Sequence, residues 1–124
     1  MTSDSPPRFA VHVERPTADA VVVSVTGDVD MGTAPEFEDR LAHAVENGQG
    51  ESLVVDLTEV SFIDSTGLNA LVRAFERQRL AGNSAALVST DPRVAMILEV
   101  ARLDRVLRRY PTRAEALSAM EAER

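Results

Sequence analysis

The sequence of 124 residues contains no lysine, so all thirteen of its basic residues are arginine. The absence of lysine excludes any mechanism that requires a Schiff-base lysine or the lysine of a phosphate-binding loop. The sequence also lacks cysteine, which excludes disulfides, a thiolate nucleophile and cysteine-ligated metals. His12 and His43 are too few for a histidine-rich metal cluster. We therefore expect no cofactor and no metal.

Long apolar runs are missing too. No run approaches the roughly 20 residues of a membrane-spanning helix, and no charged segment followed by an apolar stretch begins the chain. We expect a cytoplasmic protein that does not bind membranes. The net charge is −7, with −9 in residues 1–60 and +2 in residues 61–124. This acidic first half disfavours nucleic-acid binding, which needs a basic surface to neutralise phosphates.

What is present is typical of one globular domain, with 44% apolar and 27% charged residues. Alternating or β-branched residues predict strands at residues 9–14, where Pro16 ends the strand, and at residues 21–26. A hairpin is the natural connection between them, and residues 27–33 form a loop. Short apolar runs predict strands at residues 53–57 and 85–88, and residues 106–110 are a candidate edge strand.

Four further segments carry apolar residues at helical spacing and predict four helices. Start and stop signals delimit each of them. The first helix begins at a capping box of Thr33 and Glu36 and ends at Gly48 and Gly50. The second follows a connector at residues 60–64 and ends at Gly82 and Asn83. The third begins with Asp91 followed by Pro92, and the fourth begins with a capping box of Thr112 and Glu115.

The resulting order is β-β-α-β-α-β-α-(β)-α. Right-handed crossovers make the later strands parallel, which predicts an α/β fold with a mixed sheet of four to five strands packed with about four helices. We expect a single domain at residues 8–121, a disordered N-terminal tail at residues 1–7 and a C-terminal tail at residues 122–124.

The most informative motif is Asp64-Ser65-Thr66-Gly67-Leu68, at the start of the second predicted helix. In one interpretation, Asp64 or Ser65 is simply a helix N-cap. In the other, the free N–H groups and the dipole of the helix N-terminus accommodate a phosphate on Ser65. Gly67, which has no side chain, would then let the active site of another protein approach closely.

Together with Gly27-Asp28-Val29-Asp30, this motif resembles the STAS-domain family, in particular the small bacterial anti-sigma factor antagonists. The resemblance covers roughly residues 8–120 and implies the STAS fold. The serine motif, preceded by Phe62-Ile63, looks like the family's phosphorylation motif. Asp28 departs conservatively from the glutamate that is common in the family's acidic loop.

The resemblance implies a partner-switching protein that is not an enzyme. By analogy, Ser65 is phosphorylated by an anti-sigma factor that is also an ATP-dependent serine kinase of the histidine-kinase-like type. The unmodified protein binds that kinase and frees a sigma factor, and a PP2C-type phosphatase restores the unmodified state. The implied partner-binding residues are Asp28, Asp30, Asp64, Ser65, Thr66 and Gly67.

Several alternatives accompany this interpretation. Thr66 is a competing hydroxyl, and a STAS-like accessory subunit of a transporter or signalling assembly would not be phosphorylated at all. Asp56 resembles the phospho-accepting aspartate of a two-component receiver, but the lysine that receivers need is missing, so a structural role is favoured. A calcium loop at residues 28–32 lacks the twelfth-position glutamate. A serine hydrolase lacks the Gly-x-Ser-x-Gly motif.

Overall fold

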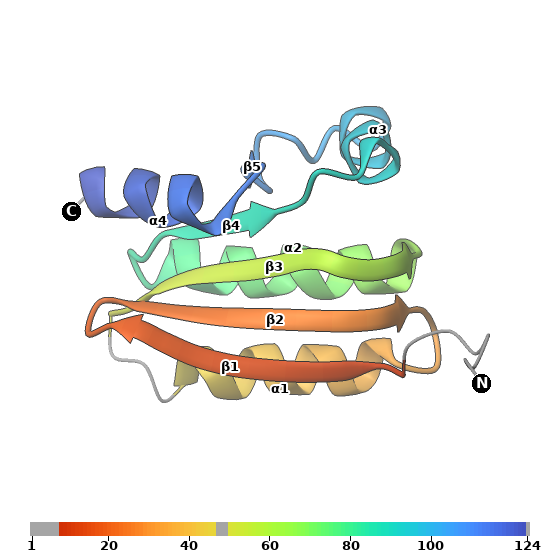
Figure 1. The fold of residues 1–124 in the computed structure, drawn as a ribbon, viewed down its shortest axis with the longest axis horizontal. Coiled ribbons are helices and arrows are strands. Elements are labelled where there is room, and N and C mark those ends of the chain that lie inside the picture. Colours follow the sequence, from red (N-terminus) through yellow and green to blue (C-terminus); the bar gives the residue numbers. More distant parts are fainter. Residues whose placement is uncertain (1–7, 47–49, 124) are drawn as a thin grey trace, which may run out of the picture.

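The computed structural model describes residues 8–46 and 50–123. The predicted tail at residues 1–7 and the Gly48 helix stop lie outside the described residues. In the described part, the chain forms five strands and four helices in the predicted order (Figure 1). They are β1 (Ala10–Thr17), β2 (Ala20–Val29), α1 (Ala34–Glu46), β3 (Ser52–Ile63), α2 (Ser65–Leu80), β4 (Ala85–Val88), α3 (Pro92–Val100), β5 (Arg109–Tyr110) and α4 (Arg113–Ala122).

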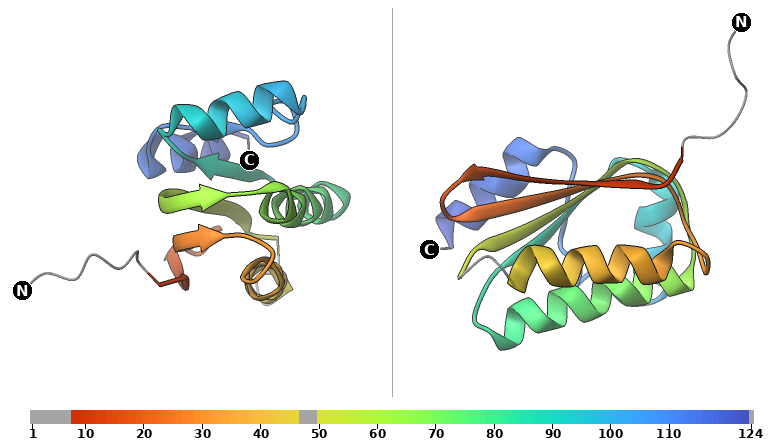
Figure 2. Two further views of the ribbon diagram at one scale, coloured as in Figure 1. Left: turned by 90° about the vertical axis from the view of Figure 1, so that its right-hand side faces the viewer. Right: turned by 90° about the horizontal axis from the view of Figure 1, so that it is seen from below.

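The five strands form one mixed sheet in the order β1-β2-β3-β4-β5, which confirms the predicted fold class. β1 and β2 are antiparallel, and each later pair of neighbours is parallel. α1 and α2 cover one face of the sheet, and α4 lies on the other (Figure 2). Because parallel strands end at the same edge of a sheet, the segments that follow β2, β3 and β4 meet at one end of the domain.

Successive side chains along each strand point to opposite faces of the sheet, so the core consists of two clusters, one on each face. In β2, Val21, Val23 and Val25 point to the larger cluster, which includes Phe37 of α1 and Leu71 of α2. The intervening residues of the strands point to a smaller cluster that α4 covers. The members of that smaller cluster are Val22, Val54, Ala86, Val88, Ala116 and Met120.

Arg113, at the start of α4, forms polar contacts with the face of the sheet that α4 covers. Its Nε donates to Asp56 Oδ2 over 2.7 Å, and its Nη2 donates to Ser24 Oγ over 2.5 Å. Burial raises the pKa of Asp56, but hydrogen bonds from Arg113 and Thr58 outweigh burial and hold that pKa below its ordinary value. Asp56 therefore joins α4 to the sheet, in agreement with the structural role predicted for it.

Replacing Arg113 by alanine is expected to lower the free energy of unfolding by about 2 kcal/mol, because the nearly buried Asp56 loses its cationic partner. Urea denaturation at pH 7 measures this loss. The matched control, Arg73→Ala, removes an exposed pair with Glu38 and should cost less than about 1 kcal/mol. The effect of Arg113→Ala should shrink as the pH falls below about 4, because protonation of Asp56 ends its ion pair in the wild type. Equal losses in the two variants would contradict this role.

The largest correction concerns residues 60–63, which were predicted as a connector and are the last part of β3. They pair in parallel with the end of β2, which itself continues to Val29, past the predicted strand end at Thr26. Register shifts in this pairing accommodate exposed polar residues such as Thr58 and Glu59, which is why neither strand shows a continuous apolar pattern here.

Smaller corrections concern the ends of other elements. β1 continues through Pro16 to Thr17, because a proline is tolerated in an edge strand next to a register shift. β5 comprises only Arg109 and Tyr110 of the predicted residues 106–110. For α4, whose end was not predicted, the last helical residue is Ala122, and Glu123, which follows it, forms an ion pair with Arg108.

The predicted N-termini of α3 and α4 are confirmed. Asp91 caps α3 with Pro92 following it, and Thr112 caps α4 by accepting from the Glu115 N–H over 3.1 Å. Of the methionines in the last two helices, Met96 of α3 is exposed and Met120 of α4 is buried.

Candidate functional site

The candidate site is built around the first turn of α2, where β3 ends and the chain turns into the helix. Asp64 is the N-cap of α2, as one of the two sequence interpretations expects. Its Oδ1 accepts from the backbone N–H groups of Thr66 over 2.9 Å and of Gly67 over 3.1 Å. This cap leaves Ser65 as the first residue of the helix, with an exposed side chain.

The two neighbouring hydroxyls differ in their surroundings. The Thr66 hydroxyl donates to Asp64 Oδ1 over 2.5 Å, and the Thr66 side chain is partly buried. Among the described residues, the Ser65 hydroxyl has no hydrogen-bond partner. Thr66 is therefore part of the cap, whereas Ser65 presents its hydroxyl to solvent.

The Asp64 carboxylate is held in its charged form. The hydrogen bond from the Thr66 hydroxyl is the main cause that keeps the pKa of Asp64 below its ordinary value. Desolvation opposes it by raising the pKa, and the backbone N–H groups of Gly67, Thr66 and Met31 lower the pKa further, so that the net shift is downward. A negative charge thus lies directly before Ser65 at neutral pH.

The loop between β2 and α1 lies beside this helix start. Asp28 pairs with Phe62 and Val29 with Ile63 in the parallel ladder of β2 and β3. The Asp64 N–H then donates to the Val29 carbonyl over 3.1 Å. The strand ends therefore bring the Asp28–Asp30 segment next to the Asp64–Ser65 segment.

Asp30 shapes this loop. Its Oδ1 accepts from the backbone N–H groups of Gly32 over 2.9 Å and of Thr33 over 3.2 Å. The Thr33 hydroxyl donates to the Asp28 carbonyl over 2.7 Å and accepts from the Asp30 N–H over 3.0 Å. The predicted capping role of Thr33 toward Glu36 is therefore wrong, because the hydroxyl turns back to the acidic loop.

Gly67 allows α2 to start in contact with the end of β2. A Cβ atom at this position would lie 2.7 Å from Val29 Cγ1, 2.8 Å from Ile63 Cγ1 and 3.0 Å from the Val29 carbonyl oxygen. Separations below 3.0 Å are far inside van der Waals contact. Gly67 is therefore required for close approach within the domain, and the approach of a partner at this glycine stays a prediction.

Two exposed apolar residues at this end were not assigned to the site from sequence. Met31, in the acidic loop, is 76% exposed, and Phe62, at the end of β3, is 53% exposed. An apolar residue within the Asp- and Gly-rich loop was the available signal for Met31. Contiguous patches of exposed apolar side chains, unlike single ones, are typical of sites that contact another protein.

Within the described residues, no group of three or more histidine and acidic side chains is placed to hold a metal ion. The helices in residues 8–46 and 50–123 are also too short or too polar to cross a membrane.

The fold and the site together define a small α/β domain that presents an exposed serine at a helix start. A family model described as "STAS domain" matches residues 11–116. The chain belongs to the STAS domain family, which confirms the resemblance noted in its sequence.

Relatives within this family share a regulatory description. The "Anti-sigma-B factor antagonist" of Listeria monocytogenes is 30% identical over 99 residues, which cover 80% of this chain and 86% of that protein. An anti-sigma factor antagonist from Mycobacterium paratuberculosis has a similar crystal structure, with a TM-score of 0.84 and 30% identity over 94% of this chain and 97% of that chain. Unphosphorylated SpoIIAA shares the fold, with a TM-score of 0.76 and 18% identity over 91% of this chain and 97% of that chain. These relatives are regulators, which confirms the prediction of a non-enzymatic protein.

Proposed function

We propose that this protein is an anti-sigma factor antagonist that phosphorylation of Ser65 switches off. The observation that carries the proposal is the contrast between the two hydroxyls at the start of α2. Ser65 is exposed and free to enter a kinase active site, whereas the Thr66 hydroxyl is bound to the N-cap carboxylate over 2.5 Å. Of the two candidate acceptors, only Ser65 is accessible without breaking the cap of α2.

An anti-sigma factor as partner is supported by the relatives, and the kinase and phosphatase proposed here rest on the resemblance to the STAS family. Unmodified, the protein binds an anti-sigma factor that is a serine kinase of the histidine-kinase-like type and so releases a sigma factor in the cytoplasm. A PP2C-type phosphatase reverses the modification. Asp28 and Asp30 adjoin Ser65 in the proposed contact surface, and the hydrogen bonds of Asp30 hold its loop in one conformation for the kinase.

The charge of the site supports a switch that acts at the interface. A phosphate adds about −1.5 to −2 charge units at pH 7. It would enter a region that already contains ionised Asp64 and the Asp28–Asp30 loop, while the N-terminus of α2 offsets part of the repulsion. We therefore expect the domain to stay folded and the complex to lose affinity.

Phosphate mapping tests this proposal. The protein is incubated with ATP and the anti-sigma factor kinase from the same genome, and the modified residue is located by mass spectrometry. We expect one phosphate on Ser65, none in Ser65→Ala, and retained modification in Thr66→Val, with circular dichroism confirming the fold of both variants. Phosphate that persists in Ser65→Ala and disappears in Thr66→Val would overturn the assignment. An unmodified protein that co-purifies with a membrane complex would instead indicate a STAS accessory subunit.

A further inference from the structure

An apolar pocket lies beside the Ser65 site, between the end of β3 and the start of α3. Its volume is about 210 Å³, and it is lined by residues 60–63 of β3 and by Asp91, Arg93, Val94 and Ile97 from the α3 side. For comparison, a cavity of about 150 Å³ with apolar walls accommodates a benzene molecule. The pocket is therefore large enough for one branched or aromatic side chain.

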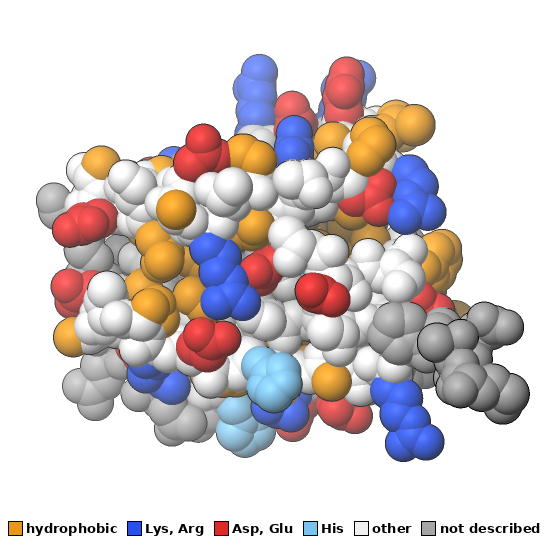
Figure 3. All heavy atoms as spheres, in the orientation of Figure 1, with side chains coloured by type: hydrophobic (Ala, Val, Ile, Leu, Met, Phe, Trp, Pro, Cys, Tyr) orange, Lys and Arg blue, Asp and Glu red, His pale blue; other side chains and the backbone are white. Residues whose placement is uncertain are grey.

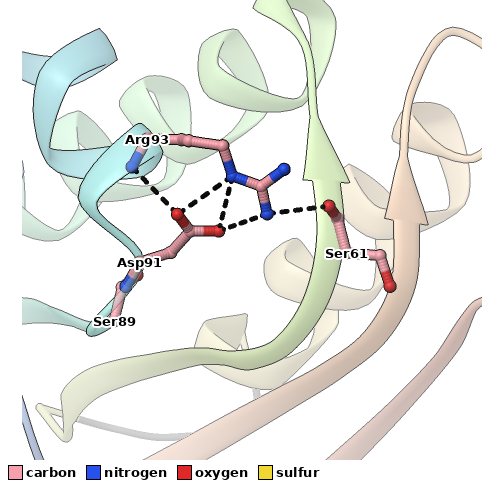
Figure 4. A network of polar contacts seen from close by, with 4 residues as sticks. All are labelled: Ser61, Ser89, Asp91 and Arg93. Carbon is pink, nitrogen blue, oxygen red and sulfur yellow. Dashed lines mark hydrogen bonds and ion pairs between the residues drawn. The ribbon is translucent and has the colours of Figure 1, made fainter.

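Arg93 lines this pocket and joins its two sides. Its Nη2 donates to Asp91 Oδ2 over 2.7 Å and reaches the Ser61 carbonyl over 3.5 Å (Figure 4). The side chain thus runs from α3 to β3, with its Nη1 directed away from Asp91. Asp91 and Arg93 supply polar groups to the lining, and Val60, Ile63 and Val94 supply apolar walls.

The pocket adjoins the residue that the proposed kinase must enclose. Phe62 and Ile63 line the pocket, and Ser65 follows Ile63 by two residues. Three trans peptide units keep the Cα atoms of Phe62 and Ser65 within about 11 Å of each other. A standard interface covers about 800 Å² on each partner, which is a patch about 30 Å across. An interface centred on Ser65 therefore extends over the pocket.

Exposed apolar side chains surround this end of the molecule. Phe62 is 53% exposed, and Met96 and Val100 on α3 are exposed as well. Hydrophobic side chains are visible on the surface at the right of Figure 3, over α3 and the end of β3. Buried apolar anchors near the centre of an interface contribute most of the binding energy.

We propose that this pocket binds one apolar side chain, such as leucine or phenylalanine, from the same kinase that phosphorylates Ser65. This inference rests on the proposed function. The pocket anchors the kinase in the same way before, during and after phosphoryl transfer. The binding that it supplies is therefore equal in the ground state and the transition state. Loss of such binding raises KM and leaves kcat unchanged.

Two changes to the pocket lining test the inference: Ile97→Phe fills the pocket, and Phe62→Ala removes part of its wall. Steady-state phosphorylation of Ser65 is measured with the kinase identified by phosphate mapping, for the full chain carrying Ile97→Phe and, separately, Phe62→Ala. We expect each variant to raise KM about tenfold with kcat unchanged, as for the loss of one anchor. The matched control is Leu80→Phe, at an exposed residue about 22 Å from Ser65 along α2, which should keep the wild-type KM.

The outcomes separate the two proposals. If the wild type is phosphorylated on Ser65 but both pocket variants keep its KM, the pocket proposal fails and the proposed function stands. If no phosphate reaches Ser65 in the wild type, both fail. A wild-type dimer that Ile97→Phe converts to a monomer would show that a second copy occupies the pocket, contrary to the proposal. Phe62→Ala, at an exposed position, keeps the test valid if Ile97→Phe impairs folding.

Discussion

Replacing Ser65 by aspartate is expected to weaken binding to the anti-sigma factor about a hundredfold while the domain remains folded. The new carboxylate would be desolvated in the interface beside Asp64, whose pKa lies below its ordinary value and which is therefore ionised at neutral pH. An unpaired charge that an interface buries costs about 3 kcal/mol, and 1.4 kcal/mol corresponds to a tenfold change in affinity. Isothermal titration calorimetry measures the change.

The control for Ser65→Asp is Ser65→Asn, which has nearly the same size and no charge. We expect Ser65→Asn to lose less than tenfold in affinity. Thermal unfolding should show nearly the same midpoint for Ser65→Asp as for the wild type, because the N-terminus of α2 offsets much of the repulsion between the new carboxylate and Asp64. Equal losses of affinity in the two variants would mean that steric exclusion, and not charge, breaks the complex.

Replacing Gly67 by alanine is expected to lower the free energy of unfolding by about 2–3 kcal/mol. The added methyl group would lie 2.7 Å from Val29 Cγ1, 2.8 Å from Ile63 Cγ1 and 3.0 Å from the Val29 carbonyl oxygen. Val29 and Ile63 are buried, and one of the three atoms belongs to the backbone, so relief requires α2 to move away from the sheet. Urea denaturation of the single domain measures the loss.

Gly32→Ala is the matched control for Gly67→Ala. A Cβ atom at Gly32 would meet only Asp30 Oδ1, at 3.4 Å, which is ordinary contact. We expect this variant to change the free energy of unfolding by less than about 0.5 kcal/mol, as for most surface substitutions. A stability of Gly67→Ala equal to that of Gly32→Ala would show that the start of α2 is not tightly held against β2.

The sequence predicted the order of elements because each core strand carries a local signal. Residues 53–57 form an apolar run that the sheet buries on both faces, and Asp91-Pro92 and Thr112 cap their helices as their types suggest. The last part of β3 carries no such signal. It becomes a strand because it pairs with the end of β2 through shifted register, which depends on the tertiary arrangement and not on local pattern.

The site could be predicted from the sequence only in part. The proximity of the Asp28–Asp30 loop to Asp64 was implied by the resemblance to the STAS family, and the parallel ends of β2 and β3 explain it. The distinction between Ser65 and Thr66 could not be predicted, because two adjacent hydroxyls look equivalent in sequence. The direction of the Asp64 carboxylate separates them, by binding one hydroxyl and leaving the other exposed. The role of Gly67 likewise required the position of Val29.

The most direct test of the central claim is sigma-factor release. A preformed complex of the anti-sigma factor and its sigma factor is titrated with the unmodified protein and, separately, with protein phosphorylated on Ser65, and free sigma factor is measured. We predict that the unmodified protein releases the sigma factor and that the phosphorylated protein does not, until phosphatase treatment restores release. Equal release by both forms would contradict the claim that one phosphate on Ser65 is the switch.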